Sequence, residues 1–95
     1  MCLVISTEVR KKLRTKHDVI EQEIVECFAN REAGFLKDIR EQHQSDPPTL
    51  WFVAETDYGR KLKVVFIYFP DTNKFVIRTA YPANPTEISI YEKHS

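Results

Sequence analysis

The sequence predicts an α+β domain, because helix patterns in its first half precede a strong β-hairpin pattern in its second half. Residues 62–69 and 75–81 are rich in Val, Ile and aromatic side chains, which favour extended strands, and the turn-forming residues 70–73 separate them. Two apolar runs joined by a short polar turn are typical of a hairpin. Since the helices are segregated from the consecutive strands, we expect two N-terminal helices packed on a roughly four-stranded antiparallel sheet, with a short C-terminal helix.

The first half of the chain carries the two helix patterns. Ser6 and Thr7 are good N-cap residues for a short helix that runs to about Lys16. Asp18 is the expected cap of a second helix, with Glu21 placed to complete a capping box. An apolar stripe along one side of this second helix should lie on the sheet. The stripe consists of Ile20, Ile24, Val25, Cys27 and Phe28.

Three shorter segments complete the predicted fold. Apolar and polar side chains alternate imperfectly in residues 35–40, which we interpret as an edge strand. The same alternation is clear in residues 50–56 and predicts a second strand. The C-terminal segment is ambiguous. Asn84, with Glu87 three residues later, favours a helix start, while residues 88–91 alternate like a strand. We favour the short helix.

Length and composition indicate one globular domain over residues 1–95. A hydrophobic content of 42% excludes a disordered chain, and no apolar run approaches the roughly 20 residues of a membrane helix. Cys2 and Cys27 lack metal-binding spacing and are expected to be free thiols, so we predict a soluble cytoplasmic protein. The sequence contains no glycine-rich phosphate loop and no HExxH or CxxC motif. We therefore expect no metal and no cofactor, and either acid–base chemistry without a metal or no chemistry.

Charge is balanced overall but distributed unevenly along the chain. The net charge is zero, which argues against a protein that coats nucleic acid non-specifically. Residues 1–17 hold five basic side chains and one acidic, residues 18–57 hold three basic and ten acidic, and residues 58–95 hold six basic and three acidic. If the two basic segments meet in space, they form a positive face that the total conceals. The basic run of the first helix is otherwise a solvated surface.

The residues best suited to chemistry are polar groups within apolar strands. A charge at Arg78 is costly unless it is paired or exposed. Arg78 is therefore expected to form a salt bridge, for example to Glu55, to lie on an exposed face, or to bind a phosphate through its planar guanidinium. Tyr81 ends the same strand and is either a core aromatic or a site residue. One face of that strand should carry Phe75, Ile77, Thr79 and Tyr81, with Arg78 on the other.

Further candidates flank the hairpin and end the first helix. Arg60, Lys61 and Lys63 surround the start of the hairpin, with the two lysines on the same side of the strand. Lys16 and His17 end the first helix. A lone histidine there is commonly solvated or hydrogen-bonded at the helix terminus, but its pKa near neutrality also fits proton transfer.

Several short motifs of this chain resemble the BrnT family of toxins, and uncharacterised small domains related to the same RelE/ParE-like toxin superfamily. Lys16-His17-x-Val19, with the helix that follows, is similar to the opening of that family. Gly59-Arg60-x-Leu62 is similar to its glycine-arginine turn into a central strand. The segment 77–91 is similar to its closing signature. The matching residues there are Ile77, Thr79, Ala80, Ala83, Asn84, Glu87 and Tyr91.

This resemblance implies a compact α+β toxin fold and a metal-independent endoribonuclease. In such enzymes a base takes the proton of the ribose 2′-OH, the oxygen attacks the adjacent phosphate, and cations stabilise the developing charge. Lys16, His17, Arg60 and Thr79 match motif residues, whereas Tyr81 stands where the family has a second strand arginine. The implied partners are RNA, including ribosome-associated mRNA, and a small antitoxin protein. We predict Arg78, Tyr81, His17 and Arg60 as catalytic residues, and Lys16, Lys61, Lys63 and Thr79 as binding residues.

Three functions are consistent with these observations. The first is the toxin-like ribonuclease, which requires cationic and hydroxyl groups from separate parts of the chain to meet over one β-surface. The second is a non-catalytic module that holds a protein partner on the same face of the sheet. The third is a small nucleotide-related hydrolase, which would need a deep enclosed pocket.

Overall fold

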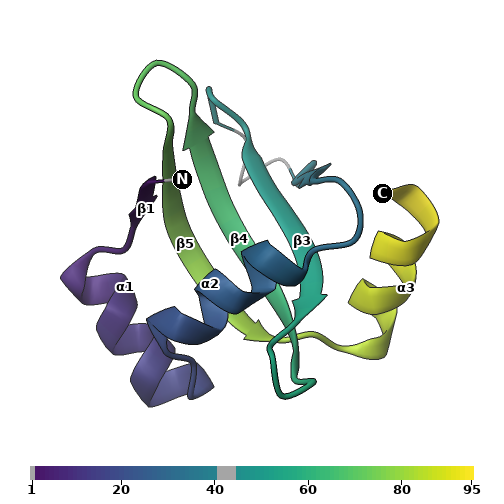
Figure 1. The fold of residues 1–95 in the computed structure, drawn as a ribbon. Coiled ribbons are helices and arrows are strands. Elements are labelled where there is room, and N and C mark those ends of the chain that lie inside the picture. The colour runs from purple at the N-terminus through teal and green to yellow at the C-terminus, as the bar shows by residue number, and fades with distance from the viewer. Residues whose placement is uncertain (1, 41–44) are drawn as a thin grey trace.

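The computed structural model describes residues 2–40 and 45–95, which form an α+β domain with three α-helices and one five-stranded mixed sheet (Figure 1). The helices are α1 (Thr7–Lys12), α2 (Glu21–Asn30) and α3 (Pro85–His94), and a π-helical segment, η1 (Leu13–His17), continues α1. The strands are β1 (Cys2–Val4), β2 (Leu36–Lys37), β3 (Thr49–Glu55), β4 (Lys61–Phe69) and β5 (Lys74–Pro82), in the order β1-β5-β4-β3-β2. No helix among the described residues combines the length and apolar character needed to cross a lipid bilayer.

The central hairpin and the C-terminal helix are confirmed. Strands β4 and β5 pair antiparallel, and Asn73 adopts the left-handed conformation in their turn, with φ of 53°. At the start of α3, the Asn84 side chain accepts from the Glu87 N–H at 2.8 Å, and the Glu87 carboxylate accepts from the Asn84 N–H at 3.1 Å. Two backbone donors are thus satisfied reciprocally, which explains why the helix forms rather than a strand. The expected edge strand is also present, as the two-residue β2.

The prediction of four antiparallel strands is wrong. Strand β1 adds a fifth, parallel strand beside β5, with Cys2 opposite Lys74 and Val4 opposite Val76. Three residues are too few for a sequence pattern to indicate a strand, and the pairing joins segments some seventy positions apart. Only the folded chain brings them together.

The second helix begins later than predicted. Asp18 is not its cap but the left-handed residue that ends η1, with φ of 52°. The helix begins at Glu21, and the Ile20 N–H donates to the Glu23 carboxylate at 3.2 Å. Ile20 therefore lies outside the helix and is 52% exposed, and Val25 is 37% exposed. The apolar side of α2 is reduced to Ile24, Cys27 and Phe28.

Helices pack from two sides of the sheet. Helix α2 crosses one face, where the Phe28 ring lies 4.8 Å from that of Phe52 and 5.4 Å from that of Phe66 (Figure 1). Helix α3 packs beside β3 from the other face, where the ring centroids of Trp51 and Tyr91 are 6.0 Å apart. Both faces of the central strands are thus covered, consistent with their nearly continuous apolar sequence.

A β-bulge at Arg78 changes which residues of β5 share a face. Val65 lies opposite Thr79, but the next residue, Phe66, lies opposite Ile77, so Arg78 is the extra residue. Side chains of directly opposed residues project to the same face. Ile77 therefore lies on the α2 face with Phe66, while Thr79 lies on the other face with Val65. The expectation that Phe75, Ile77, Thr79 and Tyr81 share one face is wrong.

Candidate functional site

A polar cluster lies on the face of the sheet opposite α2. It consists of Trp51 on β3, Lys63 on β4, Tyr81 on β5 and Glu87 on α3, and we call it the Lys63 cluster. The Glu87 carboxylate accepts from the Lys63 ammonium at 2.9 Å and from the Tyr81 hydroxyl at 2.9 Å. The ammonium also lies 4.5 Å from the centre of the Trp51 ring. Two strands and one helix therefore meet at a single carboxylate, and the third strand contacts it through the Lys63 ammonium.

Hydrogen bonds to both carboxylate oxygens hold the Glu87 side chain in one orientation. One oxygen caps α3 through the Asn84 N–H, and the other takes the bonds from Lys63 and Tyr81. Burial alone would raise the pKa of Glu87, but the hydrogen bonds from Lys63, Asn84 and Tyr81 outweigh it and hold the pKa below its ordinary value. Glu87 is thus an ionised acceptor near neutral pH and not a proton donor.

His17 joins this cluster from the N-terminal part of the chain. Its ring centroid is 5.5 Å from that of Tyr81, in a tilted arrangement. Burial, followed by the charges of Lys12 and Lys16, lowers the pKa of His17. Burial and the hydrogen bond to Glu87 raise the pKa of Tyr81. Near neutral pH a neutral imidazole therefore lies beside a protonated phenol. These are the protonation states that a general base and a general acid require.

Arg60 organises the junction between η1 and α2. Its guanidinium donates to the carbonyl of His17 at 3.0 Å and to that of Asp18 at 2.6 Å. The same group forms an ion pair with Glu23 at 3.1 Å. Arg60 was predicted to be catalytic, but both of its terminal nitrogens donate to these three partners. Its evident role is to fix the backbone that carries His17.

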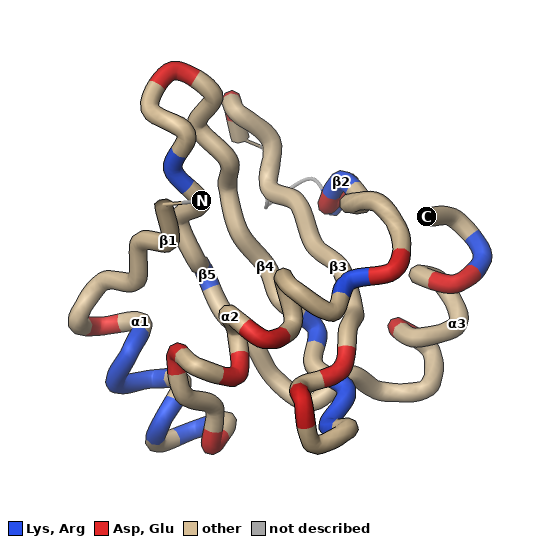
Figure 2. Tube along the Cα trace, viewed as in Figure 1, with Lys and Arg blue, Asp and Glu red and all other residues tan. Residues whose placement is uncertain are grey.

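The structure brings some of the remaining predicted residues close to the cluster and leaves others apart. Thr79 lies on the cluster face of β5, two residues before Tyr81. Lys16 and Lys61 are exposed. Arg78 is exposed and forms no salt bridge with any described residue, and the suggested pair with Glu55 is absent because β4 separates the two strands. The basic positions of α1 and η1 face solvent along one side of the molecule (Figure 2).

Sequence reasoning missed four participants: Trp51, Glu87, Glu23 and Arg40. Glu87 was predicted only to start the last helix and to match the closing signature, and no local pattern indicates that its second oxygen accepts hydrogen bonds from two strands. The pKa of Arg40 is raised by its hydrogen bonds to Asp38 and, more weakly, by Tyr81 and Glu87, so its charge acts on the Lys63 cluster. Within residues 2–40 and 45–95, no group of three or more His, Cys, Asp or Glu side chains could hold a metal ion.

The Thr79 hydroxyl provides a first prediction. Its oxygen is buried and has no hydrogen-bond partner among the described residues. Thr79→Val keeps the shape and removes the unsatisfied polar group, so we expect the free energy of unfolding to rise by about 1 kcal/mol. Urea denaturation followed by circular dichroism measures this change. A loss of stability would contradict the prediction and would indicate that the hydroxyl has a partner in solution.

Comparison with known proteins assigns no family to this chain. No protein-family model matches the chain, and no curated protein sequence does either. The resemblance to BrnT and RelE/ParE-like toxins therefore stays a prediction.

Proposed function

We propose that this chain is a toxin-like, metal-independent endoribonuclease that acts in the cytoplasm and is neutralised by a small antitoxin protein. The observation that carries the proposal is the contact between the His17 and Tyr81 rings, 5.5 Å apart, beside a fixed carboxylate. It supports a joint action of His17 as base and Tyr81 as acid, because the two rings come from distant parts of the chain and lie in contact. The basic surface of α1 and η1 beside it favours a polyanionic substrate.

Each residue of the site has a distinct role in the proposed reaction. Neutral His17 takes the proton from the ribose 2′-OH, and the oxygen attacks the adjacent phosphorus. The 5′-oxygen leaves and takes a proton from Tyr81, so the products carry a 2′,3′-cyclic phosphate and a 5′-OH. Arg78 and Lys16, both exposed, bind the phosphate and stabilise its developing charge. Lys63 and Glu87 hold the Tyr81 phenol in place.

The test is cleavage of a defined RNA by the purified protein in the presence of EDTA. We expect products with 2′,3′-cyclic phosphate and 5′-OH ends, identified by mass spectrometry. Arg78→Ala should reduce cleavage at least about tenfold while the protein stays folded. Lys74→Ala is the matched control, because Lys74 is an exposed cation at the first position of the same strand. A wild-type protein inert toward free and ribosome-bound RNA would exclude the proposal.

A non-catalytic protein-binding module is the second candidate, and one observation favours it. The side chain of Lys63 is only 12% exposed and is paired with Glu87, while Arg60 is bound to Glu23 and two carbonyl groups. Lys63 and Arg60, two of the predicted cationic site residues, therefore stabilise the fold through these contacts. Under this function, RNA is not cleaved and the same face binds a protein.

The pKa of His17 provides a prediction that does not depend on activity. Lys12 and Lys16 both lower this pKa, so Lys12→Gln and Lys16→Gln should each shift it upward toward about 6.5. Proton NMR titration of the imidazole measures the shift. Because the folded pKa lies below the ordinary value, the unfolded chain takes up the proton first. Stability is therefore lost as the pH falls from about 6.5 to the folded pKa. An unchanged pKa in both variants would contradict the prediction.

A further inference from the structure

Basic side chains cover α1 and η1 (Figure 2). Residues 7–17 contain five Lys or Arg residues and one acidic residue, and all five basic residues are exposed. Arg10 forms an ion pair with Glu21 at 2.7 Å. The other four form no salt bridge with a residue that the structure describes. They are Lys11, Lys12, Arg14 and Lys16. Their charges are therefore available to a molecule outside the fold.

These charges lie on one side of the proposed reaction centre. His17 contacts Tyr81 from η1, which follows α1 on the β1 side of the sheet (Figure 1). Lys63 lies on the other side of Tyr81, directly opposite it on β4. Helix α3 lies beyond Lys63, against β3, and carries two glutamates and one lysine.

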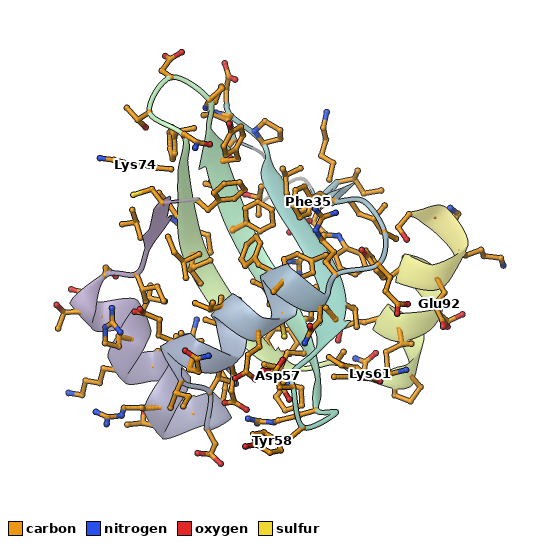
Figure 3. All side chains as sticks on the ribbon, in the orientation of Figure 1. Phe35, Asp57, Tyr58, Lys61, Lys74 and Glu92 are labelled. Atoms are coloured by element: carbon orange, nitrogen blue, oxygen red, sulfur yellow. The ribbon has the colours of Figure 1, made fainter. Side chains whose placement is uncertain are left out.

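Three cations on the Lys63 side each have an acidic neighbour. The pairs are Lys63 with Glu87 at 2.9 Å, Arg40 with Asp38 at 2.8 Å, and Lys61 with Glu55, which lie opposite each other on β4 and β3. Figure 3 labels Lys61 and, close to it, Asp57, a further acidic residue. Excess positive charge is therefore found on the His17 side of Tyr81.

The proposed reaction gives these two sides different meanings for an RNA strand. The 2′-OH that loses its proton to His17 belongs to the nucleotide on the 5′ side of the cleaved bond. The 5′-oxygen that takes a proton from Tyr81 belongs to the nucleotide on the 3′ side. The attacking and leaving oxygens lie on opposite sides of the phosphorus in an in-line displacement. The 5′ part of the strand therefore extends past His17, toward η1 and α1.

We propose that α1 and η1 bind the phosphates on the 5′ side of the cleaved bond, and that this contact sets the direction in which a single RNA strand lies on the protein. The inference rests on the proposed ribonuclease. Lys12 precedes Lys16 by one helical turn, about 6 Å along the axis, so the two side chains share one side of the helix. When Lys16 binds the scissile phosphate, Lys12 is placed for the next phosphate, and Lys11 lies beside it.

The electrostatics of His17 support this placement. Burial lowers the pKa of His17, and the charges of Lys12 and Lys16 lower it further. Both ammonium groups therefore act on the imidazole, as groups beside the reaction centre must. A phosphate bound by them also brings no unpaired negative charge into the site.

The experiment neutralises phosphates on one side of the cleaved bond at a time. The substrate is a short RNA whose cleavage site has first been mapped. In one version, two linkages on the 5′ side of that site carry neutral methylphosphonates with methylated 2′-oxygens, and in a second version two linkages on the 3′ side do. Strands with the methylated sugars alone correct for the methyl groups. We expect kcat/KM at the mapped bond to fall at least about tenfold for the 5′ version and less than about threefold for the 3′ version.

The variant Lys11→Gln/Lys12→Gln should lose this asymmetry. Since its 5′ contacts are already gone, neutral 5′ linkages should cost it less than about threefold. The change that Lys12→Gln causes in the pKa of His17 cancels, because each variant is compared with itself on two substrates. Lys37→Gln/Lys93→Gln is the matched control, since it removes the same charge from exposed positions on β2 and α3. It should keep the full tenfold dependence.

Circular dichroism checks the fold of each variant, and Lys12→Gln alone replaces the double variant if that variant does not fold. The inference is overturned by equal losses for the two neutralised strands, by a larger loss for the 3′ version, or by an undiminished 5′ dependence in the lysine variant. These three outcomes leave the ribonuclease standing. A wild-type protein that does not cleave the unmodified RNA overturns the ribonuclease, and this inference with it.

Discussion

Replacing His17 with Gln should lower RNA cleavage by a factor of about one hundred or more, the usual contribution of a general base. Glutamine retains much of the imidazole's size and polarity but cannot accept the 2′-OH proton. The ring of His17 lies against that of Tyr81, and Arg60 holds its carbonyl, so the variant should keep its backbone position. The measurement is the initial rate of cleavage of a short labelled RNA. Circular dichroism checks the fold.

His94→Gln is the matched control for this variant. Because His94 is exposed at the end of α3, the His94→Gln variant should cleave RNA at the wild-type rate. The pH profile adds a second readout. Because burial and the neighbouring lysines lower the pKa of His17, the acid limb of the wild-type profile should fall below about pH 6.5. A His17→Gln enzyme as active as the wild type would remove His17 from the reaction, whatever the other residues do.

Lys63→Met should reduce the free energy of unfolding by about 2–3 kcal/mol, less than the loss for a fully buried pair because both side chains keep some exposure. The exposed fractions are 12% for Lys63 and 16% for Glu87. Methionine fills similar space but leaves the Glu87 carboxylate without its cation. Urea denaturation at neutral pH measures the loss.

Lys63→Met/Glu87→Gln separates charge from packing in this prediction. The glutamine carbonyl still accepts from the Asn84 N–H and caps α3, its amide N–H can donate to the Tyr81 hydroxyl oxygen, and no unpaired charge remains. The double variant should therefore regain at least half of the stability lost by Lys63→Met.

The pH dependence provides a further check on the Lys63–Glu87 pair. In the wild type the pKa of Glu87 is lowered, so its stabilisation is present above the ordinary carboxyl pKa and is lost as the pH falls through the folded value. In Lys63→Met the pKa of Glu87 should rise, so the difference in stability between wild type and variant should shrink at acid pH. A constant difference from pH 3 to pH 7 would contradict the ion-pair explanation.

Local sequence alone determined the hairpin, the α3 cap and the fold class. Residues 70–73 are turn formers between two apolar runs, and Asn73 takes the left-handed conformation that few residues tolerate. Asn84 and Glu87 satisfy each other's backbone donors three positions apart. Both features depend on neighbours within one turn of chain, which is why a pattern in the sequence could predict them.

The candidate site could be predicted only in part. His17 and Tyr81 were identified as single candidates from residue type, but their contact joins η1 to β5. The role of Arg60 could not be foreseen, because its partner carbonyls lie 42 and 43 positions earlier in the chain. A pocket of about 720 Å³ beside α3 was also missed, because its lining comes from α2, β3, β4, α3 and the loops next to them.

The tertiary structure determined which side chains of β5 share a face of the sheet with those of the other strands. One inserted residue, Arg78, moves Thr79 and Tyr81 to the face where Lys63 and Glu87 lie. The period-two rule assumes an unbroken strand, and no residue type in this sequence signals a bulge at that position. Short-range preferences in the sequence therefore determined most of the strands and helices, whereas β1 forms only through its pairing with β5. The pairing register, set by packing between distant segments, decided which side chains meet.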